Sequence, residues 1–222
     1  MKFINLTRRT EIGANSYYLE IGGQRIVLDC GMHPKNNGEE ALPNFKAIAG
    51  PKIEAILISH GHQDHIGTLP VLMRRQPAAR IFMTETTAEI GSVLLHNSVN
   101  VMTRQREEIG AVMYPLFTHR ETDRAADLWQ WCPLRQPMLI SGERVPQRET
   151  DALTFEFFDA GHVLGSAGIL LRADGRTIFY TGDVNFDDQT IMEAAILTSP
   201  VDRKSTRLNS SHWITSRMPS SA

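Results

Sequence analysis

The segment Ser59-His-Gly-His-Gln-Asp-His-Ile-Gly67 constrains the folding of this 222-residue chain more than any other part of it. Its side chains of metal-binding type all fall within six positions: His60, His62, Asp64 and His65. They directly follow residues 53–58 (IEAILI), an apolar run that is typical of a buried strand. Side chains this close in sequence converge only if the backbone turns sharply, which Gly61 and Gly67 allow. Because imidazole and carboxylate are ligands of zinc and its neighbours, the segment predicts a metal-binding turn at the end of a strand.

Elsewhere, the alternation of apolar and polar residues predicts strands that come in groups, with helices between them. Two pairs of strands joined by tight turns are expected, residues 16–21 with 25–29 and residues 167–172 with 177–181. The remaining elements expected are strands at 3–6, 80–83 and 153–158, and helices at 45–49, at 66–75, from 84 or 86 to about 106, and over 125–129 after a capping-box pattern at 118–121. Such a grouping suits an α+β fold in which two β-sheets pack face to face and are flanked by helices.

The pattern H-x-H-x-D-H after a strand resembles the hallmark of the metallo-β-lactamase superfamily. Three further segments resemble that superfamily's other motifs in the expected order: residues 27–31 (VLDCG), 160–162 (AGH) and 180–183 (YTGD). The resemblance implies the αββα sandwich of that superfamily, with two packed mixed β-sheets flanked by helices and incomplete at the C-terminus.

The same resemblance implies a centre with two metal ions. His60, His62 and His162 would bind the first ion. Asp64 and His65 would bind the second, and Asp183 would lie between the two ions. The superfamily's fifth motif supplies one more histidine late in the chain, and none occurs between residues 183 and 201.

The implied cofactors are two Zn²⁺ ions, with Mn²⁺ as the alternative, and the implied chemistry is hydrolysis. Two adjacent cations hold and acidify one water, and the resulting hydroxide attacks a phosphorus or a carbonyl carbon. Asp64 and Asp183 are the residues assigned to catalysis. Asp29 is expected to orient the histidine turn through hydrogen bonds without binding metal.

Residues 161–167 (GHVLGSA) narrow the resemblance to one branch of the superfamily. They are similar to the G-H-x-L-G-S/A-A signature of the β-CASP nucleases, which process RNA. Residues 82–87 and 114–123 also resemble segments of this branch, although the first lacks its proline and Phe117 replaces a tyrosine in the second. The implied function is a ribonuclease that cleaves phosphodiester bonds of single-stranded RNA with a zinc-activated hydroxide.

The excess of acidic over basic residues leaves functions other than RNA cleavage possible. Residues 1–201 contain 19 basic and 24 acidic residues, whereas a nucleic-acid enzyme usually carries a basic surface. A small-molecule hydrolase of the same fold, acting on a thioester or a lactone, is therefore an alternative, as is a DNA nuclease. A subunit without enzymatic activity is a third alternative, which the intact H-x-H-x-D-H pattern disfavours.

Residues 202–222 differ in character from the rest of the chain. They are rich in serine, threonine and arginine, and they show no period of 2 or 3.6 residues. They resemble one reading frame of a sequencing adapter, so we expect a non-native, disordered tail; a native basic tail is the alternative. Residues 1–201 are then expected to be the N-terminal part of a metallo-β-lactamase domain, truncated before or at the start of the β-CASP insert. On this interpretation the fragment binds metal weakly and is inactive.

Composition indicates the surroundings of the protein. Two cysteines give no disulfide framework, the first residues do not form a signal peptide, and the longest apolar runs are too short to cross a bilayer. We therefore expect a cytoplasmic protein without a membrane partner. The oligomeric state stays open, with a homodimer as one alternative.

Overall fold

The computed structural model describes residues 1–8, 13–50, 52–145, 152–196 and 206–208. Its first sheet has six strands whose order in space follows the chain. The strands are β1 (Lys2–Asn5), β2 (Tyr17–Ile21), β3 (Gln24–Leu28), β4 (Ala55–Leu57), β5 (Arg80–Met83) and β6 (Trp129–Trp131). Strands β1 to β3 are antiparallel and β3 to β6 are parallel, so the sheet is mixed.

The second sheet is built from the later part of the chain. Its order in space is β11-β10-β9-β8-β7, from β7 (Met138–Leu139), β8 (Thr154–Asp159), β9 (Ala167–Ala173), β10 (Arg176–Tyr180) and β11 (Thr206–Leu208). Strand β11 pairs in parallel with β10. The expectation of a tail without regular structure is therefore wrong for residues 206–208, because β10 offers a sheet edge with which they pair. Residues 202–205 and 209–222 lie outside the described part of the chain.

Helices separate the parallel strands β3 to β6 of the first sheet. They are the short 3₁₀ helices Gly38–Ala41 and Phe45–Ile48, followed by α1 (Gln63–Ile66), α2 (Leu69–Arg75), α3 (Glu85–Ile109) and α4 (His119–Ala126). Thr84 caps α3, and Thr118 with Glu121 forms the predicted capping box of α4. No described helix is both long and apolar enough to cross a membrane.

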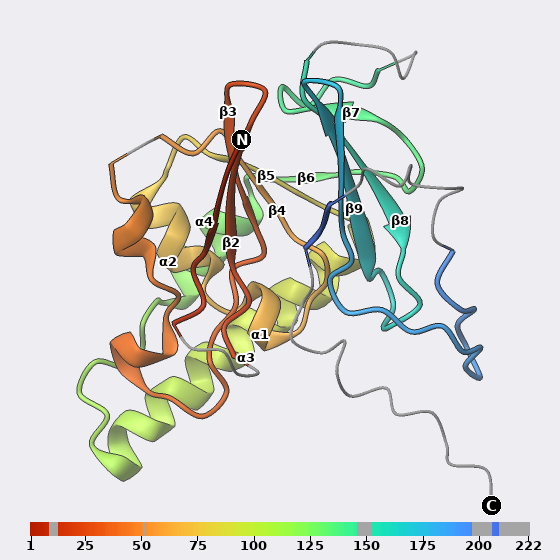
Figure 1. The fold of residues 1–222 in the computed structure, drawn as a ribbon. Coiled ribbons are helices and arrows are strands. Elements are labelled where there is room, and N and C mark those ends of the chain that lie inside the picture. Colours follow the sequence, from red (N-terminus) through yellow and green to blue (C-terminus); the bar gives the residue numbers. More distant parts are fainter. Residues whose placement is uncertain (9–12, 51, 146–151, 197–205, 209–222) are drawn as a thin grey trace, which may run out of the picture.

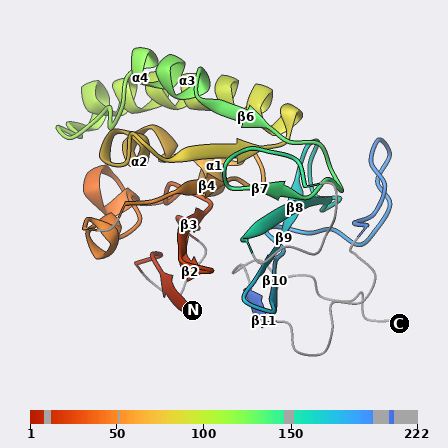
Figure 2. The ribbon, with the colours of Figure 1, turned by 90° about the horizontal axis from the view of Figure 1, so that it is seen from above.

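The first sheet buries apolar side chains on both of its faces, so it lies between two other layers. Figure 2 shows α2, α3 and α4 on one side of the first sheet and the second sheet on its other side. The first core lies between the helices and the first sheet, and includes Val27, Ile56, Ile81 and Leu95. A second core lies between the sheets, where Leu28 and Leu57 pack with Phe155 and Phe157 of β8. The fold of two packed mixed sheets is thus confirmed, and within the described residues the α-helices lie beside the first sheet (Figures 1 and 2).

Two predicted elements differ from the structure. The helix expected at 66–75 begins only at Leu69, as α2, and the separate short helix α1 precedes it. Between them the Thr68 hydroxyl donates to the carbonyls of Cys30 and Gly31. The helix expected to extend to Trp129 ends at Ala126, and Trp129 begins β6 instead.

Candidate metal centre

All of the predicted ligands lie just after strands, at one end of the two sheets. His60 and His62 follow β4, whereas Asp64 and His65 lie on α1, which begins immediately afterwards. The other two, His162 and Asp183, follow β8 and β10 of the second sheet. Residues 100 positions apart, His62 and His162, are brought together because the two sheets pack face to face with these ends aligned.

One group of side chains is compact enough for a single metal ion, and we call it the primary group: His60, His62, His162 and Asp183. Each residue offers one ligand atom, and these four atoms lie within 4.8 Å of one another. His62 Nδ1 is central, 3.1 Å from His60 Nε2 and 3.2 Å from His162 Nε2. The Asp183 Oδ2 atom is 3.6 Å from His162 Nε2.

Asp64 and His65, which we call the secondary pair, lie beside this group. His65 Nε2 is 3.8 Å from Asp64 Oδ2 and 3.4 Å from Asp183 Oδ1. The two oxygens of Asp183 therefore face different partners, one toward His162 and the other toward His65. This is the intermediate position that the sequence predicts for Asp183, while metal binding by each residue stays a prediction.

Asp29 lies behind the centre and accepts hydrogen bonds from three neighbours. Its carboxylate accepts from the Ser59 amide and hydroxyl, each at 2.7 Å, from His65 Nδ1 at 2.7 Å and from the Tyr180 hydroxyl. Asp29 is fully buried. It thus makes the hydrogen bonds to the histidine turn that the sequence led us to expect.

These hydrogen bonds fix which nitrogen of two histidines faces the centre. A carboxylate only accepts, so the Ser59 hydroxyl donates to Asp29 and must accept from His60 Nδ1, which lies 3.0 Å away. His60 then presents Nε2 as an acceptor. His65 likewise uses Nδ1–H toward Asp29 and presents Nε2 toward Asp183. Partners of this kind orient metal-binding histidines and increase their basicity.

The charge in this part of the molecule favours a cation. Burial by itself lowers the pKa of His65, but the neighbouring carboxylates of Asp29 and Asp183 outweigh it and raise that pKa to about 10. Burial and then the Asp29 charge raise the pKa of Tyr180 well above its ordinary value, so its hydroxyl stays a donor. Carboxylates that are buried away from water, such as those of Asp29 and Asp183, are stable only beside a positive charge.

The donor set fits a divalent cation. Nitrogen ligands at about 2.0 Å from a tetrahedral ion lie about 3.3 Å apart, close to the separations around His62 Nδ1. Three imidazoles and a carboxylate are also ligands of the kind that zinc and related metals take in proteins.

Sequence reasoning missed three residues of the centre: Asn15, Ser59 and Tyr180. The Asn15 side-chain amide lies 2.9 Å from His65 Nε2 and 3.5 Å from Asp64 Oδ2, and it is buried. Its backbone also bonds to Asp64 and Gly31. Ser59 and Tyr180 are adjacent to motifs that the sequence analysis used, which was a signal for them, whereas no pattern around Asn15 pointed to it.

The loop that carries His162 is held from two sides. The hydroxyls of Thr84 and Thr87, at the start of α3, both donate to the Gly165 carbonyl, at 2.7 and 2.9 Å. On the other side, the Gln189 amide donates to the Gly161 carbonyl at 2.9 Å. Gly165 has φ of +80°, and a Cβ there would lie 2.7 Å from the Thr87 nitrogen, so this close docking requires glycine.

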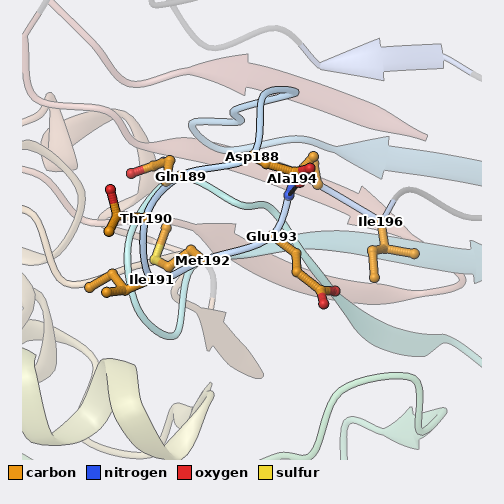
Figure 3. A pocket seen from close by; sticks show the side chains of 9 residues that line it. Asp188, Gln189, Thr190, Ile191, Met192, Glu193, Ala194 and Ile196 are labelled. Atoms are coloured by element: carbon orange, nitrogen blue, oxygen red, sulfur yellow. Dashed lines mark hydrogen bonds between the residues drawn. The ribbon is translucent and has the colours of Figure 1, made fainter.

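The segment after Asp183 folds into an open hollow of about 710 Å³, lined by Asp188–Ile196 alone (Figure 3). The segment that forms this hollow is bonded to the residues just before His162. The Asn185 amide donates to the Ala160 carbonyl, and the Gln189 side chain donates to the Gly161 carbonyl. None of the predicted ligands lines it.

Comparison with known proteins agrees with this geometry. Residues 9–98 match the model of the Metallo-beta-lactamase superfamily. The chain is 31% identical over 189 residues to cleavage and polyadenylation specificity factor subunit 3-I of Arabidopsis thaliana, covering 85% of this chain and 25% of that protein. It is 28% identical over 220 residues to endoribonuclease ysh-1 of Neurospora crassa, covering 99% of this chain and 24% of that protein. It thus spans about a quarter of the length of these relatives.

Among solved structures, a metallo-β-lactamase HARLDQ-motif mutant from Cronobacter sakazakii matches with a TM-score of 0.50 and 18% identity. The match covers 80% of this chain and 59% of that one. At this identity the likeness concerns the fold alone.

Proposed function

This chain belongs to the metallo-β-lactamase superfamily, in its β-CASP RNA-processing branch, and on that premise we propose that the whole protein is a metal-dependent endoribonuclease. The observation that carries the proposal is the primary group, in which three histidines and Asp183 from two sheets meet within 4.8 Å. The similarity to a protein named as an endoribonuclease supports RNA as the substrate.

We propose two zinc ions as the cofactors, with manganese as the alternative. The primary group would hold the first ion, and the secondary pair with Asp183 would hold the second. When bound, the ions would supply an activated water and neutralise the charge that develops on the phosphate.

The side chains of this chain contribute orientation and charge. Asp29 and Ser59 orient His60 and His65 so that their Nε2 atoms face the centre. Asp183 lies between the primary group and the secondary pair, because one of its oxygens faces His162 and the other faces His65. We assign Asp64 and Asp183 as the carboxylates that take part in catalysis, and single-stranded RNA as the substrate whose backbone would reach this end of the sheets.

The test uses the full-length protein, supplied with zinc or manganese, on matched single-stranded RNA, double-stranded RNA and single-stranded DNA. We expect cleavage of single-stranded RNA that stops on chelation, returns when metal is restored, and is absent in His162→Ala. Turnover of thioesters or lactones without cleavage or binding of RNA would overturn the proposal in favour of a small-molecule hydrolase. Cleavage of DNA alone would identify a DNA nuclease.

A further inference from the structure

A groove of about 290 Å³ lies between α3 and the segment after β3, and its lining includes Gln63 of the histidine turn. One wall is a single stripe of α3, which includes Asn97, Val101 and Gln105 at helical spacing. The opposite wall is the segment that begins at Met32, and Tyr114 lies at the side. In Figure 1 this segment, in orange, runs beside the yellow-green helix α3.

The chemistry of the groove is distinctive because its lining has hydrogen-bonding groups but no charged side chain of Lys, Arg, Asp or Glu. Its side-chain amides are Asn36, Asn37, Gln63, Asn97 and Gln105. Its apolar surface includes Met32, Leu94 and Met102. A phosphate finds no Lys or Arg in this lining, whereas a flat, uncharged ring with donors and acceptors on its edge matches both the amides and the apolar surface.

Gln63 connects the groove to the metal centre. It stands between His62 and Asp64 in the chain, and consecutive Cα atoms are about 3.8 Å apart. Its side chain turns away from those ligands: Oε1 accepts from the Ser98 hydroxyl at 2.7 Å, and Nε2 donates to the Met32 sulfur at 3.2 Å. One residue of the groove lining, Gln63, is therefore adjacent in the chain to two predicted metal ligands.

We propose that this groove binds one unpaired nucleobase of the RNA strand that is cut, next to the phosphate at the metal centre. This inference rests on the proposed function. Side-chain amides pair with base edges through adjacent donors and acceptors, and methionines adapt to flat ligands. The small volume of about 290 Å³ and the wall formed by one helix face suit a single base better than an extended peptide, which needs main-chain partners along a strand.

The experiment compares two variants of the full-length protein on the same helix. Asn97→Leu removes an exposed amide from the groove and introduces a residue with high helix propensity, so α3 is not weakened. Asn100→Leu is the matched control, because Asn100 is also an exposed amide of α3 but its side chain faces His119 outside the groove. Gln105→Leu removes a second groove amide independently.

Two measurements are made with short single-stranded RNAs in which one nucleotide at a time is abasic. The first is binding to metal-stripped protein by fluorescence anisotropy, and the second is kcat/KM with metal restored. For the unaltered protein we expect one position near the cut where loss of the base weakens binding and kcat/KM by about 10-fold. In Asn97→Leu and Gln105→Leu this base dependence shrinks to about 3-fold or less. In Asn100→Leu it stays as in the unaltered protein.

The outcomes separate the two proposals. If the unaltered protein cleaves RNA but no position shows a base dependence, or if all three variants keep it unchanged, the groove does not hold a base and the inference is overturned. A peptide segment would then be the better occupant. If the unaltered protein neither binds nor cleaves RNA, the proposed function itself fails, and the inference fails with it.

Discussion

The primary group and the secondary pair are built from the same kinds of side chain but differ in how closely their ligand atoms lie. In the primary group, His62 Nδ1 lies 3.1 and 3.2 Å from the nitrogens of its two histidine neighbours. In the secondary pair, His65 Nε2 lies 3.8 Å from Asp64, and the Asn15 amide is nearer, at 2.9 Å. The histidine nitrogens of the primary group are already spaced as they would be around a bound ion, whereas the secondary pair has to exchange a hydrogen bond for a metal.

This difference implies two affinities. An ion that enters the primary group finds its ligands assembled, so little binding energy is lost to rearrangement. An ion that enters the secondary pair displaces the Asn15 contact to His65 Nε2 first. We therefore expect the full-length protein to bind one ion tightly and a second more weakly, with Asp183 coupling the two.

The largest effect is expected for His62→Ala, which tests the tight half of the comparison. His62 contacts both other histidines of the primary group and is only half-buried, so its removal deletes the central ligand with little loss of packing. We expect the affinity for the tight ion to fall by more than about 100-fold. Competition with a chromophoric chelator measures this, and an unchanged tight site would show that the primary group is not the site of higher affinity.

Asp64→Asn tests the weak half. The substitution keeps the shape of the side chain but removes its charge, which lies 3.8 Å from His65 Nε2. We expect the affinity for the weaker ion to fall by about 10- to 100-fold, while the tight ion is retained within a few-fold. Metal content after graded dialysis distinguishes one ion per chain from none, and equal loss of both ions would mean that the two groups act as one site.

Asp29→Asn is expected to weaken both halves, because Asp29 connects to His65 directly and to His60 through Ser59. An amide in its place donates on one side, so a buried donor of Ser59 or Tyr180 loses its acceptor. We expect about 10-fold weaker binding of each ion. The same titration measures it, with Asp64→Asn as the control that affects one ion alone.

How much of this could be read from the sequence depends on the range of each interaction. The histidine turn and both strand pairs were predicted because their signals lie within about ten residues of each other. The strand Trp129–Trp131 was missed, because three residues are too few to show a period and the preceding capping box favoured helix. Only tertiary packing with β5 decides that it is a strand.

The supporting contacts of the site are harder to predict than its ligands. A motif names residues by type and order, so Asp183 and His162 could be assigned before their positions were known. Asn15 contributes through one amide and a backbone bond to Asp64, 49 residues away, and nothing in its neighbours marks it. The groove between α3 and the segment after β3 could not be predicted from the sequence either, because its residues come from separate elements and none of them is a predicted metal ligand.

The smallest effect on metal binding is expected for Thr118→Ala. This variant tests whether the metal affinities of the primary group and the secondary pair depend on the geometry of the centre or on the stability of the whole fold. Thr118 caps α4 together with Glu121, and neither residue lines the metal centre. Losing the cap costs about 1 kcal/mol of unfolding free energy. Both metal affinities should stay within two-fold of the unaltered protein, as an order-of-magnitude limit set by that remote cost.

The pH dependence of the unfolding free energy is a second measurement on the same variant, because Thr118 bonds to the titratable Glu121 of α4. Burial raises the pKa of Glu121, but hydrogen bonds from Thr118 and the ion pair with Arg74 outweigh it, so the pKa in the folded protein is lower than the ordinary value of 4.5. The ionised carboxylate therefore stabilises the fold at neutral pH, and this stabilisation is lost as the pH falls below 4.5 through the folded-state pKa. Thr118→Ala should make the acid-induced loss of stability smaller, as measured by urea unfolding between neutral and acid pH with metal absent. A change in either metal affinity at neutral pH that matched the change in stability would instead tie the difference between the two groups to the fold as a whole.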